Sequence, residues 1–376
     1  MAKKINLGQY QIGDQARCFI IAEAGTAHNG QLSKGLKLIE AAQKAGADCI
    51  KFQIVFASEI VHPLCGNIDL PGGKISIFKR FQQLEQPFEF YQHLKKEAES
   101  AGLLFLASVF GEKSAEIMLK LNAFCIKIAS PELNHLPLLK YLAHCKLPSI
   151  VSTGVSRLAD IETALAILGS EVALLHCVTS YPAPPQDYNL NILPNLKNIF
   201  NVPCGVSDHT LDPLLIPLTS LLVGCSLIEK HLTLSREDKG LDDPIALTPD
   251  DFKLMVDEIR QAETTSIKLL RKRLDKLFGH DLIEAVLGDG SKHLALSEKN
   301  NFNTTRRSIM AIRDIDAGEP FSKQNLAILR SEKNLSPGLE PAFWDIVLSR
   351  RASRYIQNGQ GIQWDDIGPS LNEKLT

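Results

Sequence analysis

Residues 18–53, CFIIAEAGTAHNGQLSKGLKLIEAAQKAGADCIKFQ, contain a complete strand–helix–strand unit. The apolar runs 18–23 and 49–53 predict two strands, and between them apolar side chains recur at helical spacing until Gly46. Both runs are continuous rather than alternating, which is typical of parallel strands buried on both faces. This stretch therefore predicts a parallel sheet covered by helices.

The same pattern recurs along the first two-thirds of the chain. The predicted strands are 18–23, 49–53, 103–108, 124–130, 149–153, 172–178, 204–209 and 227–233. Eight strand–helix units suit an α/β fold of the (β/α)8 TIM-barrel type, which takes about 250 residues. A doubly wound open sheet would show the same alternation. The count of eight, and the polar residues that follow each strand, favour the barrel.

The character of the sequence changes after Pro249. Residues 250–278 are charged and helix-prone, 288–303 are polar, and short strands and turns follow from Arg306. We predict a barrel domain over 1–275, a linker over 276–303 and a small domain over 304–376. A domain of that size has a small core, so we expect it to dock on another surface.

Composition excludes several classes of function. The 376 residues carry 41 Lys+Arg and 43 Asp+Glu without a basic block, which argues against nucleic-acid binding. No apolar stretch reaches the ~20 residues of a membrane span. The first residues, MAKKIN, lack the apolar core of a signal peptide, so we expect a cytoplasmic protein. The eight cysteines form no C-x-x-C pair and lie mostly in apolar runs, which predicts buried free thiols.

Polar residues end all eight predicted strands, where a TIM barrel carries its active site. One group supplies cations and hydroxyls: Lys51, Ser108, Lys127, Ser130, Ser152, Thr153 and Ser180. This group suits a ligand with a phosphate and a carboxylate. Alternatively, the hydroxyls cap turns and helices, and the lysines form ion pairs with Glu23 or Glu132 inside the barrel.

His209 and His231 end adjacent predicted strands, so both rings can face one point above the barrel. Two imidazoles with open positions suit Mn²⁺ or Mg²⁺. The alternative is a hydrogen-bonded pair of structural histidines. Glu23 and Glu132 are candidates for acid–base chemistry or for binding sugar hydroxyls. Tyr181 begins the rigid loop YPAP and is a candidate for the pocket wall.

Six motifs resemble the sialic acid synthases and occur in the order of that family. They are IAEAGTAHNG (21–30), AGADCIKFQ (45–53), KIASPEL (127–133), LHCVTSYPAP (175–184), VSDHTL (206–211) and IEKHLTL (228–234). RRS (306–308) with DAGE (316–319) is similar to the antifreeze-like (SAF) domain of the same family. The resemblance spans nearly the whole chain.

The resemblance implies condensation of phosphoenolpyruvate with an N-acylated hexosamine to a nine-carbon 2-keto acid and phosphate. In the family, a divalent metal (Mn²⁺ or Mg²⁺) polarises the sugar aldehyde and C3 of phosphoenolpyruvate attacks it. Water then adds at C2 and phosphate leaves. Two alternatives stay open: another phosphoenolpyruvate-dependent aldol-type synthase acting on a different sugar, and a non-catalytic sugar-binding paralogue.

The resemblance also implies roles for individual residues. Its catalytic residues would be Glu23, Lys127 and Glu132, with Glu132 near the reacting carbons. The metal ligands would be His209 and His231. The substrate-binding residues would be Lys51, Gln53, Ser108, Ser130, Ser152, Ser180, Tyr181, Asp242, Arg306 and Arg307. One of the two arginines would reach into the neighbouring subunit's site and contact the N-acyl group, which implies a domain-swapped homodimer.

The sequence departs from the family pattern on the sugar side. Asp243 stands where the family often has histidine, Ala246 where it has serine, and 66–86 is too long for a simple strand–helix connection. A loop of that length is typical of a lid or a binding loop. The acceptor therefore stays open between N-acetylmannosamine, a diacetamido-trideoxy hexose and a spore-coat-type sugar.

Overall fold

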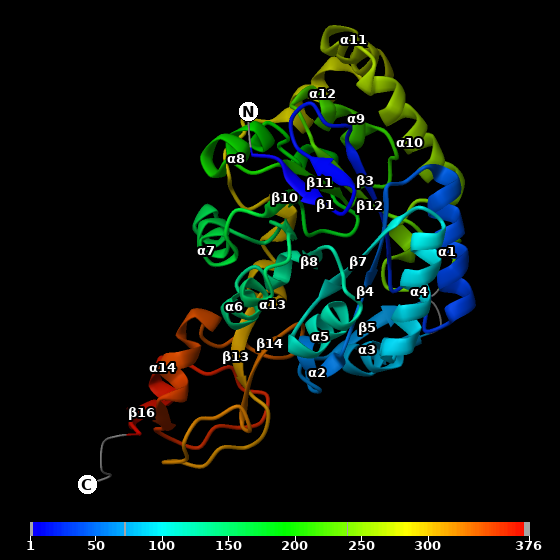
Figure 1. Ribbon diagram of the computed structural model, residues 1–376. Coiled ribbons are helices and arrows are strands. Elements are labelled where there is room, and N and C mark those ends of the chain that lie inside the picture. Colours follow the sequence, from blue (N-terminus) through cyan, green and yellow to red (C-terminus); the bar gives the residue numbers. More distant parts are fainter. Residues whose placement is uncertain (1–2, 71–72, 239, 372–376) are drawn as a thin grey trace.

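The structure, a computed structural model, describes residues 3–70, 73–238 and 240–371 (Figure 1). Its centre is a closed barrel of eight parallel strands, each hydrogen-bonded to the next in chain order. The strands are β3 (Phe19–Gly25), β4 (Cys49–Gln53), β7 (Leu104–Val109), β8 (Ile126–Ile128), β9 (Ser149–Ser152), β10 (Val172–Cys177), β11 (Cys204–Asp208) and β12 (Leu227–His231). β12 pairs with β3 and closes the ring. The predicted TIM barrel is confirmed.

Helices follow the strands and cover the outside of the barrel (Figure 1). They are α1 (Leu32–Ala45), α4 (Phe88–Ser100), α5 (Glu112–Lys120), α6 (Leu136–Cys145), α7 (Leu158–Leu168), α8 (Ile192–Phe200), α9 (Leu215–Leu222) and α10 (Pro249–Glu263). α1 ends where Gly46 adopts a left-handed conformation, with φ of 83°. Glycine suits that position because it has no Cβ to clash there.

The barrel interior is apolar at its amino end and polar at its carboxyl end. Side chains two residues apart on a strand point to the same side. The change from apolar to polar therefore follows pairs along each strand: Ile21 and Glu23, Cys49 and Lys51, Leu106 and Ser108, Cys125 and Lys127, Ile150 and Ser152, and Leu227 and Glu229. The apolar members pack with the hairpin of β1 (Ile5–Leu7) and β2 (Tyr10–Ile12), which closes the amino end. Polar side chains consequently gather at the opposite, carboxyl end.

The predicted long loop 66–86 contains regular structure. It follows the short helix α2 (Ala57–Ile60) and forms an antiparallel hairpin of β5 (Asn67–Leu70) and β6 (Gly73–Ser76), then helix α3 (Ile77–Leu84). Ser76 caps α3 by accepting a hydrogen bond from the Lys79 amide at 3.5 Å. Pro71 and Gly72 lie outside the described residues.

The C-terminal part begins with α11 (Ile267–Phe278), α12 (His280–Leu287) and α13 (Phe302–Thr305). A small unit with its own apolar core follows, formed by β13 (Arg307–Ala311), β14 (Leu326–Arg330), α14 (Trp344–Leu348), β15 (Arg350–Ala352) and β16 (Ile367–Ser370). α12 lies inside the predicted linker 276–303, and the boundaries at 275 and 303 stay predictions. Asn134 pins the unit to the barrel by two hydrogen bonds, with the Arg307 carbonyl (2.9 Å) and amide (3.2 Å).

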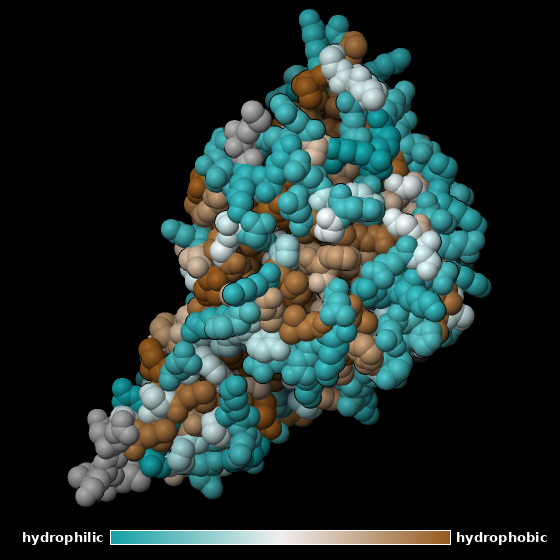
Figure 2. Space-filling model, in the orientation of Figure 1, coloured by the Kyte–Doolittle hydropathy of each residue, from teal (hydrophilic) through white to brown (hydrophobic). Residues whose placement is uncertain are grey.

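Hydrophilic residues cover most of the face shown in Figure 2, with apolar residues gathered near its middle and on the C-terminal unit. None of the helices in the described ranges has the length and apolar composition needed to cross a membrane. All eight cysteines are free and seven of them are buried, as predicted.

Candidate active site

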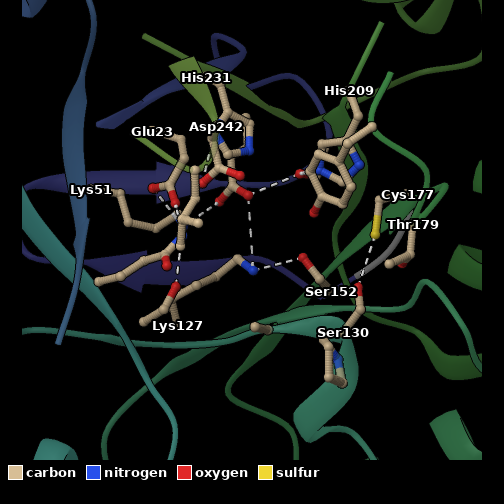
Figure 3. Close-up of a pocket in the computed structure, with 18 of the residues that line it drawn as sticks. Glu23, Lys51, Lys127, Ser130, Ser152, Cys177, Thr179, His209, His231 and Asp242 are labelled. Carbon is tan, nitrogen blue, oxygen red and sulfur yellow. Dashed lines mark hydrogen bonds and ion pairs between the residues drawn. The ribbon is translucent and has the colours of Figure 1, made fainter. Parts of the chain in front are cut away.

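A cavity of about 210 Å³ opens at the carboxyl end of the barrel, and all eight strands contribute side chains to it (Figure 3). Eleven of the predicted site residues line it: Glu23, Lys51, Gln53, Ser108, Lys127, Ser130, Ser152, Tyr181, His209, His231 and Asp242. Ser180, Glu132, Arg306 and Arg307 are not among the lining residues.

Two buried lysines lie on either side of Glu229 on the cavity floor. Lys51 Nζ is 2.6 Å from Glu23 Oε2 and 3.5 Å from Glu229 Oε2. Lys127 Nζ donates to Ser152 Oγ at 2.6 Å and lies 3.9 Å from Glu229 Oε1. The expected alternative of a Lys51–Glu23 ion pair is therefore present, and the pair lies in the cavity wall.

The pKa values of this cluster follow from burial and charge together. Burial raises the pKa of Glu23, although Lys51 opposes that effect. Burial alone would raise the pKa of Glu229, but the charges of Lys127 and Lys51 hold it below its usual value. Burial lowers the pKa of Lys127. Lys51 has two carboxylates within 3.5 Å, whereas Lys127 has one at 3.9 Å, so the Lys127 ammonium is the better placed of the two for an anionic ligand.

Hydroxyls line the side of the cavity next to Lys127. Ser130 Oγ accepts the Gly154 amide at 3.0 Å and lies 3.0 Å from Cys177 Sγ. Thr179 lines the cavity, and its Oγ1 is buried without a hydrogen-bond partner. Thr179 lies two residues after Cys177 and so continues the inward-facing side of β10.

The predicted role of Ser180 does not match its position. Its Oγ donates to the Pro182 carbonyl at 3.0 Å, outside the cavity lining. The alternation along the chain turns Ser180 away from the barrel interior, so Thr179 supplies the hydroxyl at this point.

His209 and His231 meet on the opposite side of the cavity, with ring centroids 5.6 Å apart. His209 Nδ1 lies 2.7 Å from the Val178 carbonyl, which fixes its proton there and leaves Nε2 directed inward. Burial lowers the pKa of both imidazoles, so both are neutral. Tyr181 stacks on His209 at 4.4 Å between ring centroids.

Two neutral imidazoles on adjacent strands fit a divalent metal whose other positions go to water or substrate oxygens. Within the ranges that the structure describes, no group of three or more His, Cys, Asp or Glu side chains forms a metal cluster. A metal here would therefore have His209 and His231 as its protein ligands.

The remaining wall is partly carboxylate and partly apolar. Gln53 Nε2 donates to Glu23 Oε1 at 2.9 Å. Burial, Glu23 and Asp243 together raise the pKa of Asp242 to about 7. Apolar side chains complete the wall: Phe81 from α3, Phe110 and Leu241. Asp243, which stands where the family often has histidine, has a local role. Its carboxylate accepts hydrogen bonds from Thr233 Oγ1 at 2.7 Å and from the Gly240 amide at 2.6 Å.

The structure places Glu132 outside the cavity lining, where its carboxylate joins the barrel to the C-terminal unit. Glu132 Oε2 accepts Arg307 Nε at 2.5 Å and Oε1 accepts Arg330 at 2.7 Å. Although burial alone would raise the pKa of Glu132, the two arginines hold it below its usual value. A carboxylate fixed in this way is a poor proton donor.

Arg306 and Arg307 also lie outside the cavity lining. Arg307 is fully buried and donates to the carbonyls of Glu59 (2.5 Å) and Phe110 (3.1 Å) in its own chain. Arg306 pairs with Asp160 at 3.1 Å. Within this chain both side chains bind residues of the barrel, and the predicted contact with a neighbouring subunit's site stays a prediction.

Among the cavity-lining residues that the sequence analysis missed are Glu229, Thr179 and Arg330. The inward direction of Glu229 and Thr179 could have been predicted from the sequence, because each lies two residues from another inward-facing residue. The place of Arg330 could not, because β14 reaches the cavity only through docking of the C-terminal unit.

The model of the NeuB family matches residues 38–268, and that of the SAF domain matches residues 306–368. The chain belongs to the NeuB family. A relative from Bacillus subtilis, spore coat polysaccharide biosynthesis protein SpsE, is 38% identical over 95% of both chains. The N,N'-diacetyllegionaminic acid synthase of Legionella pneumophila is 32% identical over 97% of this chain and 98% of its own.

Solved structures agree with this membership of the NeuB family. The crystal structure of Bacillus subtilis SpsE superposes with a TM-score of 0.83 at 36% identity, covering 98% of this chain and 100% of that one. The N-acetylneuraminic acid synthetase of Leptospira borgpetersenii gives 0.63 at 30% identity, covering 80% and 95%. The chain is thus a NeuB-family protein, built as a TIM barrel with a C-terminal SAF domain, and its relatives include sialic-acid-type synthases.

Proposed function

We propose that this NeuB-family chain condenses phosphoenolpyruvate with an N-acylated hexosamine, giving a nine-carbon 2-keto acid and phosphate. The observation that carries the proposal is the cavity itself. It combines two buried lysines and a hydroxyl wall on one side with two neutral imidazoles on the other. The names of the relatives, which include synthases of N,N'-diacetyllegionaminic and pseudaminic acid, support the same reaction class.

In this proposal the lysine side of the cavity binds phosphoenolpyruvate. Lys51 and Lys127 would neutralise its phosphate and carboxylate. The hydroxyls beside them would donate hydrogen bonds to the same oxygens: Ser108, Ser130, Ser152 and Thr179. Because these groups are already buried and oriented, little reorganisation accompanies binding.

The acceptor sugar would occupy the side with the histidines. Glu23, Gln53, Tyr181 and Asp242 offer oxygen and nitrogen atoms for its hydroxyl and acyl groups. His209 and His231 would hold a divalent metal, Mn²⁺ or Mg²⁺, which supplies Lewis-acid polarisation of the aldehyde when bound. The chain's own contribution is to hold the two substrates in contact, in the orientation that bond formation needs.

A phosphorylated acceptor fits this cavity less well. A second phosphate needs a second cationic site, and Arg330 is the one arginine among the described residues that line the cavity. Its guanidinium already pairs with Glu132 at 2.7 Å. An uncharged acylated sugar is therefore the better match.

Phosphate release tests the proposal. The purified chain is incubated with phosphoenolpyruvate, Mn²⁺ or Mg²⁺, and either N-acetylmannosamine or a diacetamido-trideoxy hexose. We expect acceptor-dependent phosphate release, which Lys127→Ala lowers by about 100-fold or more. Lys96→Ala, at an exposed position on α4, is the matched control and should keep full activity. No phosphate release with any acylated hexosamine would contradict the proposal.

We also propose a cytoplasmic location and a homodimer. Eight free cysteines without a disulfide fit a reducing compartment. The SAF domain has its own small apolar core and binds Glu132 of the barrel through Arg307 and Arg330, and exchange of this domain between two copies would preserve the same contacts.

A further inference from the structure

The segment between α12 and α13, residues 288–301, runs along the barrel mouth and binds the backbone of two strand-end loops. Lys292 Nζ donates to the Thr153 carbonyl at 2.9 Å. Glu298 Oε1 accepts the amides of Val155 at 2.8 Å and Thr179 at 2.7 Å. Asn301 Nδ2 donates to the Thr179 carbonyl at 3.0 Å. Glu298 thus joins the loops after β9 and β10, although it lies more than a hundred residues away in the sequence.

Both loops belong to the hydroxyl wall of the cavity. Residues 153–155 directly follow Ser152, and the Gly154 amide donates to Ser130 Oγ at 3.0 Å. A Cβ on Gly154 would lie 2.2 Å from Thr179 Oγ1 and 3.0 Å from Ser130 Oγ. The loops are therefore in direct contact, and a shift of either one moves the hydroxyls of Ser130 and Thr179.

The loop after β9 also has a backbone conformation that needs support. Val155 has φ of 41°, in the left-handed region, and it is buried. A β-branched residue adopts that region only at a cost in free energy, so surrounding contacts must hold it there. The carboxylate of Glu298 binds the amide of this same residue.

Thr179 gives an independent indication of a ligand at this wall. Its Oγ1 faces the cavity and is buried without a hydrogen-bond partner, while Glu298 and Asn301 bind its amide and carbonyl. A buried hydroxyl that has no protein partner, on a backbone held from both sides, is suited to a bound oxygen anion.

We propose that Glu298 is a positioning residue for the phosphoenolpyruvate site. It does not line the cavity, and it acts by holding Val155 and Thr179 so that the hydroxyl wall is in place before the anion binds. This inference rests on the proposed function, because it assigns the wall to phosphoenolpyruvate. It predicts a selective effect on that substrate, since the Glu298 carboxylate binds the amides of Val155, Thr179 and Ala295.

The test compares Glu298→Ala and Glu298→Gln with Ser297→Ala. Ser297 is a matched control because its hydroxyl binds Asp187 at 2.6 Å and so ties the same segment to the barrel away from the cavity. We expect Glu298→Ala to raise the KM for phosphoenolpyruvate about tenfold, with the acceptor KM changed less than about twofold. Calorimetric titration with phosphoenolpyruvate alone should show the same loss of affinity.

Glu298→Gln should give an intermediate KM for phosphoenolpyruvate. Its amide oxygen can still accept hydrogen bonds from the amides of Val155 and Thr179. Its NH2 group, however, would face the Ala295 amide, which donates a hydrogen bond to Glu298 Oε2 at 3.2 Å. Ser297→Ala should leave both KM values unchanged.

An unchanged KM for phosphoenolpyruvate in Glu298→Ala, or an equal rise in both KM values, overturns the inference while leaving the proposed function intact. If the alanine variant does not fold, the KM of Glu298→Gln for phosphoenolpyruvate decides the question: an unchanged value overturns the inference. A parent chain that neither binds phosphoenolpyruvate nor releases phosphate overturns the proposed function and the inference together.

Discussion

Glu229 lies between Lys51 and Lys127 and keeps two buried ammonium groups compatible with the fold. Its Oε1 also accepts Ser207 Oγ at 2.9 Å. Removing one member of a buried charge cluster leaves its partners uncompensated in a medium of low polarity. The buried lysines that could bind an anion therefore also lower the stability of the folded chain when no anion is bound.

We predict that Glu229→Gln lowers the free energy of unfolding by about 3 kcal/mol, measured by urea denaturation. Glu171→Gln is the control, because the Lys3–Glu171 pair is 40% and 54% exposed, and it should cost less than about 0.5 kcal/mol. Equal losses in the two variants would show that the cavity cluster is no more sensitive than a surface pair.

We predict that the free energy of unfolding depends on pH through His28. It is fully buried with Nε2 unpartnered, and burial, Lys34 and Arg80 lower its pKa to about 4. An unfolded histidine titrates near 6.5, so the unfolded chain takes up a proton first as the pH falls. Its stabilising contribution is complete above about pH 6.5 and is lost between pH 6.5 and 4, by about 3 kcal/mol in all.

His28→Gln should remove that part of the pH dependence. Urea denaturation at pH 7 and pH 4.5 should give a smaller difference in unfolding free energy for this variant than for the parent. His93→Gln, at an exposed position, should leave the difference unchanged. An identical pH dependence in parent and His28→Gln would contradict the shifted pKa.

Single residues differ in how well the sequence could predict them. Lys51, Lys127, His209 and His231 lie in or directly after predicted strands that begin with apolar residues, so their place near the carboxyl end of the barrel could be predicted from local pattern. Thr179 could have been preferred to Ser180 from the two-residue alternation of a strand.

At the scale of the element, α3 gives the 66–86 segment a place in the cavity wall. The hairpin leads into α3, which brings Phe81 into the cavity wall. The sequence analysis could identify this segment as too long for a simple connection. Its structure could not be predicted because its packing depends on distant side chains, such as Phe110 and Leu335.

Phe81→Ala should weaken acceptor binding and leave phosphoenolpyruvate binding unchanged. A lost aromatic contact in a binding pocket raises the acceptor KM about tenfold, measured by phosphate release at saturating phosphoenolpyruvate. Phe124→Ala is the control, because that ring is 53% exposed near the amino end of the barrel. A rise in the KM for phosphoenolpyruvate instead would place Phe81 on the other side of the site.

At the scale of the whole molecule, one barrel carboxylate binds two arginines of the SAF domain. Glu132, on the barrel, binds Arg307 and Arg330, which lie 175 and 198 residues away. A single sequence contains no local pattern that pairs residues at such separations. The barrel and the small domain could therefore be predicted, whereas their contact and the place of Arg330 could not.

Co-expression of Arg330→Ala with Lys127→Ala, each with its own tag, tests the predicted exchange of SAF domains. If two copies exchange this domain, each mixed dimer has one intact site, and the doubly tagged fraction should recover activity. Random pairing gives about a quarter of the parent's activity in the whole mixture. An inactive mixed fraction would show that each SAF domain serves its own barrel.

The hairpin of β1 and β2 has a consequence for turnover. Ile5, Leu7 and Ile12 seal the amino end of the barrel completely, so substrates and products share the carboxyl mouth as their route. The SAF domain stands beside that route with Arg330 at its edge. Because substrates and products use the same opening, a product must leave the cavity before the next substrate can enter. The rate of the enzyme should therefore respond to solvent viscosity whenever product exit is slower than bond formation.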